Sequence, residues 1–231
     1  ITYGDWSSDV CSSDLAHSNL GNLAAAQGQA EAAVRHYREA LRIRPDYAEV
    51  HYNLGNILAA QGQTDAAIAC FQEALQLRPN SAEAHNNLGN SLFYQGRMAE
   101  AEQQFASALD IHSNFADAHY NLANLYFQTG HLDQAISHYD QVLKIRPDYA
   151  EAHNNRGNAL RHLKHPEAAL QSYEAALAIN PDFAGAYSNR GCALRDLAQP
   201  AGARSVRMAR PRDQQSSCGL PLGAGARRCR Q

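Results

Sequence analysis

Asparagine recurs at a fixed interval along the sequence. One series has a spacing of 34 residues and comprises Asn19, Asn53, Asn87, Asn121, Asn155 and Asn189. A second series follows three residues later and comprises Asn22, Asn56, Asn90, Asn124 and Asn158. A carboxamide carries a donor and an acceptor, as does the peptide group of an extended chain. We therefore expect these amides to form a ladder that holds a polypeptide by its backbone. The alternative is that they cap or bridge neighbouring helices.

Aromatic residues lie between the two asparagine series and would supply apolar contact area on the same surface. Some of them would instead pack between repeats, and this alternative stays open at the level of the sequence. The candidate ligand-binding aromatics are Tyr52, Phe93, Tyr94, Tyr120 and Phe127. Together with the asparagines from Asn53 to Asn189 in the first series and from Asn56 to Asn158 in the second, they form the predicted peptide-binding site.

Other chemistry is not indicated. The five histidines that recur with the same period would lie about 10 Å apart in stacked helices, whereas zinc ligands lie ~2 Å from one ion; they are His17, His51, His85, His119 and His153. The five cysteines form no C-x-x-C pair. No set of nucleophile, base and orienting group stands out. We expect no metal, no cofactor and no catalytic residue.

Further columns keep the same period and predict the elements that must carry these side chains. Alanine, an aromatic ring and leucine recur in the second half of each unit, for example Ala67, Phe71 and Leu75. Glycine recurs at 28, 62, 96 and 130, where it suits a helix C-terminus, and Lys164 departs from this column. Proline ends the second helix in most units. Each unit is therefore predicted to contain two helices, with repeats at 14–47, 48–81, 82–115, 116–149 and 150–183 and a partial repeat at 184–203.

The pattern resembles the tetratricopeptide repeat, a helix-turn-helix unit of 34 residues, over residues 16–198. Histidine replaces the family's familiar tryptophan at the fourth position of each unit. The resemblance implies an all-α superhelix in which the first helix of each repeat lines a concave groove, and a scaffold that binds a protein or peptide. The repeats are also similar to those of O-linked N-acetylglucosamine transferases, including Spindly-like bacterial proteins. The alternative function is therefore substrate recognition beside a catalytic domain that lies elsewhere.

Both ends of the chain depart from the repeats. Residues 5–15 match the translation of a high-throughput sequencing adapter, so we interpret residues 1–15 as an artefact and expect them to be disordered. Residues 204–231 lose every repeat column and are rich in arginine, which favours a frameshifted or disordered tail. The alternative is a basic arm for RNA or lipid.

Charge and hydropathy limit the classes of partner that the sequence predicts. The formal net charge of −3 argues against nucleic-acid binding, which normally needs a basic face. No apolar run reaches the ~20 residues of a membrane helix. We expect a cytoplasmic protein that binds neither nucleic acid nor membrane. The sequence does not predict its oligomeric state.

Overall fold

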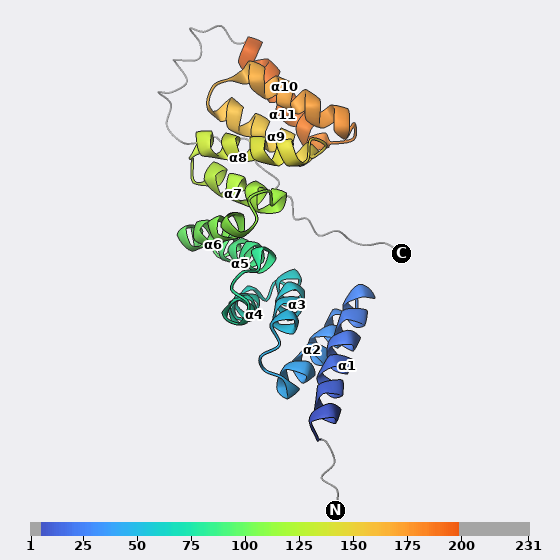
Figure 1. Cartoon of the computed structure of the whole chain (residues 1–231). Coiled ribbons are helices and arrows are strands. Elements are labelled where there is room, and N and C mark those ends of the chain that lie inside the picture. Colours follow the sequence, from blue (N-terminus) through green and yellow to red (C-terminus); the bar gives the residue numbers. More distant parts are fainter. Residues whose placement is uncertain (1–5, 199–231) are drawn as a thin grey trace, which may run out of the picture.

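The computed structural model describes residues 6–198, with side chains from residue 13 onward, and this part of the chain is all-helical. Its helices stack one after another in pairs and form a curved solenoid (Figure 1). Each helix packs on its neighbours along the chain, which is typical of repeat proteins. The prediction of an α-α superhelix is confirmed. The helices are α1 (Trp6–Ala26), α2 (Ala30–Ile43), α3 (Ala48–Ala60), α4 (Thr64–Leu77), α5 (Ala82–Tyr94), α6 (Met98–Ile111), α7 (Ala116–Gln128), α8 (Leu132–Ile145), α9 (Ala150–His162), α10 (Pro166–Ile179) and α11 (Ala184–Ala198).

Each repeat turns from its first to its second helix through a left-handed residue. The predicted glycines have positive φ, from 72° at Gly28 to 84° at Gly130. The amide of Gly28 donates to the carbonyl of Ala25 at 3.0 Å, so the turn satisfies carbonyls that the helix end leaves free. Lys164 takes the same conformation, with φ of 67°, although it has a side chain. The fifth repeat therefore keeps the left-handed turn although lysine replaces glycine there.

The core of each repeat is an aromatic ring of the second helix packed on a glycine of the first. The ring of Phe71 lies so close to Gly55 that a Cβ there would be 2.7 Å from the ring. The fourth repeat has Ala123 and Tyr139 in these places, and both are buried. Fully buried alanines such as Ala67 let the paired helices approach closely. Small residues on one helix thus make room for a large one on the next.

The N-terminal helix differs from the sequence-based prediction. α1 begins at Trp6, so residues 6–15 are helical rather than disordered. A helix that is already anchored gains one hydrogen bond for each residue added, so extension is easier than initiation. Asp14 is buried and its carboxylate lies 2.8 Å from Nε of Arg44. The predicted tail at 204–231 lies outside the described residues, as do residues 1–5.

Candidate polypeptide-binding groove

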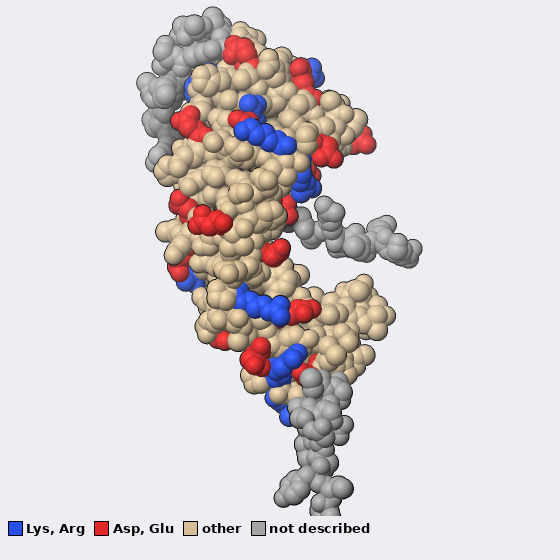
Figure 2. Space-filling model, viewed as in Figure 1, with Lys and Arg blue, Asp and Glu red and all other residues tan. Residues whose placement is uncertain are grey.

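The predicted amides lie on the odd-numbered helices, which line the inner side of the solenoid (Figure 1). The space-filling view shows the molecule hollowed on that side, with acidic and basic side chains scattered rather than gathered in one field (Figure 2). The first-series amides from Asn53 to Asn189 are half-buried. They are therefore close to the groove surface and also within reach of neighbouring helices.

The first-series amides bridge consecutive repeats. From Asn53 to Asn189, each Nδ2 donates to an oxygen on the preceding odd-numbered helix. Asn53 donates to Oδ1 of Asn22 at 3.1 Å, and Asn87 donates to Oδ1 of Asn56 at 2.8 Å and to the hydroxyl of Tyr52 at 3.2 Å. The corresponding acceptors are Asn86 for Asn121, Asn124 and Tyr120 for Asn155, and Asn154 for Asn189. The Nδ2 donors of these amides therefore bridge neighbouring helices, which is the alternative interpretation given in the sequence analysis.

Three of the second-series amides also accept a hydrogen bond from inside their own repeat. The hydroxyl of Tyr139 donates to Oδ1 of Asn124 at 2.6 Å, and that of Tyr173 donates to Asn158 at 2.9 Å. The hydroxyl of Tyr37 donates to Asn22 in the same way at 2.8 Å. These contacts satisfy buried phenols, whose desolvation is costly when they are left unpaired. Phe71 and Phe105 occupy the same place in the second and third repeats and have no hydroxyl to donate.

Asn90 is the second-series asparagine that this hydrogen-bond network does not include within residues 13–198. Its own repeat supplies Phe105 instead of a tyrosine, and Asn121 of the next repeat donates to Asn86 instead. Of the five second-series amides, Asn90 alone makes no side-chain hydrogen bond within residues 13–198. Its amide is therefore available to a ligand as both donor and acceptor.

Asn90 lines a pocket between α3 and α5, which we call the groove pocket. Tyr94 stands at its edge and is 71% exposed, the largest exposure among the large apolar side chains of the described residues. The structure thus brings four predicted site residues together in one hollow. The lining residues are Asn56, Ala59, Ala60, Thr64, Phe71, Asn87, Asn90, Ser91 and Tyr94.

The other predicted aromatics are not free groove residues. Tyr52 and Phe93 pack on the core of the first repeats, and Phe127 makes an edge contact with His162 with ring centroids 5.3 Å apart. Burial, helped by the neighbouring Tyr149, raises the pKa of Tyr120 to about 12, so its hydroxyl stays protonated. Asn86 and Asn154 also act as bridging partners, which the sequence-based prediction did not include. Each directly precedes a first-series asparagine, and this position could have indicated the role.

The periodic histidines have a structural role that the sequence did not suggest. The Nε2 atoms of His51, His85, His119 and His153 lie 2.8–3.0 Å from the backbone carbonyl six residues earlier. A carbonyl only accepts, so Nε2 carries the proton and donates. Each ring therefore ties the start of a repeat to the loop before it. The described residues contain no group of three metal-ligating side chains.

One histidine pair shows a strong electrostatic effect. Nδ1 of His119 lies 3.0 Å from Nδ1 of His138, and because Nε2 of His119 is the donor to Ser113, its Nδ1 accepts from His138. Burial lowers the pKa of His138 to about 4, and His119 contributes to this shift. His138 is therefore neutral at neutral pH and serves packing and hydrogen bonding.

Models described as TPR repeat match residues 21–62 and 55–93, and models described as tetratricopeptide repeat match residues 92–159 and 150–183. The matches run without a gap from residue 21 to residue 183. The chain belongs to the tetratricopeptide repeat family.

Solved structures agree with this assignment. The chain is similar to a MamA structure at 26% identity with a TM-score of 0.67, covering 70% of this chain and 95% of that one. YrrB, described as a TPR protein with an unusual peptide-binding site, shares the fold at 23% identity with a TM-score of 0.64, covering 79% and 91%. Pseudomonas aeruginosa pilF does so at 21% with a TM-score of 0.65, covering 87% and 94%. No curated protein matches the sequence.

These comparisons concern the repeats and the fold. The similarity to O-linked N-acetylglucosamine transferases stays a prediction. Among residues 6–198, no helix combines the length and apolarity that a membrane span requires.

Proposed function

We propose that this repeat array is a protein-interaction scaffold that holds an extended polypeptide on its inner face, with the groove pocket as the central contact. The observation that carries the proposal is Asn90, a half-buried carboxamide without a side-chain partner among residues 13–198, beside the exposed ring of Tyr94. A free donor and acceptor next to an exposed aromatic ring suits a peptide group and its adjacent side chain.

The remaining ladder has a supporting role in this proposal. Asn87 is held by Asn56 and Tyr52, so the wall of the pocket is ordered before a ligand arrives. Pre-organisation lowers the entropic cost of binding. The amides at Asn53, Asn121, Asn155 and Asn189 would offer a ligand their remaining hydrogen-bonding capacity, because their Nδ2 atoms already donate within the array.

The description of YrrB as a TPR protein with a peptide-binding site supports a polypeptide as the ligand class for a fold of this kind. The alternative function, substrate recognition for a transferase of the O-linked N-acetylglucosamine type, would use the same inner face. The proposal assigns no catalytic residue or cofactor to the described residues, and it takes protein or peptide as the partner class.

The test is binding of a random decapeptide library to the wild type and to an Asn90→Ala, Tyr94→Ala double variant. One neutral hydrogen bond and one partly exposed ring together correspond to a loss of roughly tenfold or more in affinity. The matched control is Gln72→Ala with Gln103→Ala, since both glutamines are exposed on even-numbered helices. Equal binding by the wild type and the groove double variant would refute the groove pocket as the central contact.

A further inference from the structure

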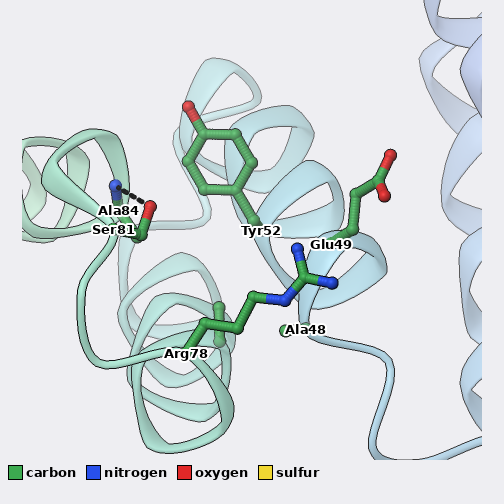
Figure 3. A pocket seen from close by; sticks show the side chains of 7 residues that line it. Ala48, Glu49, Tyr52, Arg78, Ser81 and Ala84 are labelled. Carbon is green, nitrogen blue, oxygen red and sulfur yellow. Dashed lines mark hydrogen bonds between the residues drawn. The ribbon is translucent and has the colours of Figure 1, made fainter.

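A second pocket lies at the N-terminal ends of α3 and α5, and its lining shares no residue with the groove pocket. Its walls are the small side chains of Ala48, Ala74 and Ala84, and its open volume is about 140 Å³. We call it the ring pocket. Figure 3 shows the ring of Tyr52 above it and Arg78 extending across its mouth toward the start of α3. A cavity of roughly 150 Å³ accommodates a benzene ring, so the ring pocket has the size of one aromatic side chain.

The fourth repeat shows what fills the same space elsewhere in this molecule. There, Tyr149 stacks on Tyr120 with ring centroids 5.0 Å apart. Arg146 lies over the Tyr149 ring at 4.6 Å from its centroid, and its guanidinium also contacts the carboxylate of Asp117 at 3.1 Å. An acid, two stacked tyrosines and an arginine thus form one closed cluster.

The second repeat contains every member of this cluster except one ring. Equivalent positions of the second and fourth repeats lie 68 residues apart, so Glu49 corresponds to Asp117, Tyr52 to Tyr120 and Arg78 to Arg146. Ser81 stands in place of Tyr149. Its hydroxyl accepts from the amide of Ala84 at 3.2 Å and caps α5, so it leaves the space beside Tyr52 unfilled.

In two further repeats, the position equivalent to Ser81 holds an aromatic ring that packs against the side chain three residues before it. Arg44 lies over the ring of Tyr47 at 3.5 Å from its centroid in the first repeat. His112 stacks on Phe115 with ring centroids 5.8 Å apart in the third. In the second repeat, Arg78 has no ring below it and makes no ion pair within the described residues. Its guanidinium is free to stack on a ring supplied from outside.

We propose that the ring pocket binds the tyrosine or phenylalanine side chain of a partner polypeptide, which stacks on Tyr52 and is covered by the Arg78 guanidinium. The proposal rests on the proposed scaffold function and names a side chain that it selects. The two pockets are neighbours, since the hydroxyl of Tyr52, which lines the ring pocket, accepts a hydrogen bond from Asn87, which lines the groove pocket. One extended peptide can therefore contact Asn90 and place a ring in the ring pocket. Stacking under a guanidinium favours an aromatic ring over an aliphatic side chain of equal size.

The first experiment uses N-acetyl-L-tyrosinamide as the probe and N-acetyl-L-leucinamide as its comparison, with binding followed by the backbone amide NMR shifts of Ser81 and Ala84. We expect saturable shifts with the tyrosine probe only. Ser81→Tyr fills the pocket from within and should abolish them. Ser81→Ala removes the cap but leaves the space open, so it should retain them. Tyr149→Ser should open an equivalent site in the fourth repeat and produce new shifts at Ala152.

Several results would overturn the ring pocket. They are equal shifts with both probes, no saturable shift in the wild type, or retention of the shifts in a folded Ser81→Tyr variant. The decapeptide library separates this proposal from the scaffold function, because tyrosine-containing peptides should lose about tenfold in affinity for Ser81→Tyr. If Ser81→Tyr keeps its affinity while the Asn90→Ala, Tyr94→Ala double variant loses affinity, the scaffold function is supported and the ring pocket is refuted. If the tyrosine probe binds at Ser81 but no library peptide binds, the ring pocket stands and the scaffold function fails.

Discussion

Replacing Lys164 by glycine should stabilise the array. The backbone at Lys164 has φ of 67°, a region that costs an L-residue about 1–2 kcal/mol. Glycine avoids this cost but loses more freedom on folding, by roughly 0.5–1 kcal/mol. The net gain expected for Lys164→Gly is therefore about 0.5–1 kcal/mol in the free energy of unfolding.

The structure isolates this backbone effect. The amide of Lys164 donates to Arg161 at 3.0 Å and that of His165 donates to Leu160 at 3.0 Å. The same two bonds occur at Gly130 and His131, at 3.2 and 2.8 Å, so the turn already has the geometry that glycine adopts elsewhere. The Lys164 side chain is exposed and makes no ion pair among the described residues, so its removal breaks no such contact.

Urea unfolding followed by circular dichroism measures the effect as a shift in midpoint at constant slope. Lys164→Ala is the control, since alanine removes the side chain and keeps the strain, and we expect little change from it. Gly130→Lys should lower stability by about 1 kcal/mol as the reverse change. If Lys164→Ala stabilises as much as Lys164→Gly, the backbone argument is wrong and the lysine side chain is the cause.

Side chains of the hydrogen-bond network, a buried histidine and an ion pair of α1 give three more measurable expectations. Asn124→Ala should lower the free energy of unfolding by about 1–3 kcal/mol in urea titrations, because the buried hydroxyl of Tyr139 loses its acceptor, whereas Asn90→Ala should cost little. Because the folded state holds the pKa of His138 near 4, below the ordinary 6.5, the unfolded chain binds the proton first. Stability should therefore fall as pH drops from 6.5 toward 4, and His138→Gln should flatten this dependence in thermal melts. Asp14→Ala should lower the melting temperature by breaking the ion pair with Arg44, and a variant Arg44→Ala that melts like the wild type would contradict a role for this pair.

The repeated architecture was accessible from the sequence because its determinants are local and periodic. A glycine at the end of a first helix, an alanine on a close helix contact and an aromatic ring beside it recur every 34 residues. Each unit packs only on its neighbours, so one correct repeat predicts the rest. The extension of α1 back to Trp6 was missed, because those residues carry no repeat column.

The sequence also placed the asparagine series on the inner face but did not reveal what their amides do. That depends on partners 15, 31 and 35 residues away, which only the packed helices bring within hydrogen-bond distance. The same column holds tyrosine in some repeats and phenylalanine in others, so this hydroxyl is one of two donors that can occupy the amide oxygen, the other being the first-series asparagine of the next repeat. Among residues 13–198, Asn90 receives neither, because Phe105 lacks a hydroxyl and Asn121 donates to Asn86.

By itself, then, the sequence determined the all-helical fold, its period and the turn glycines, since these follow from backbone preferences repeated along the chain. The tertiary structure decided which side chains are free. Within the described part of the chain, it left Asn90 without a side-chain partner, exposed Tyr94, and kept an unfilled space where Ser81 replaces a ring. The physical reason is that the availability of a polar group or a pocket is a property of neighbours across repeats, and neighbours are set by packing rather than by residue type.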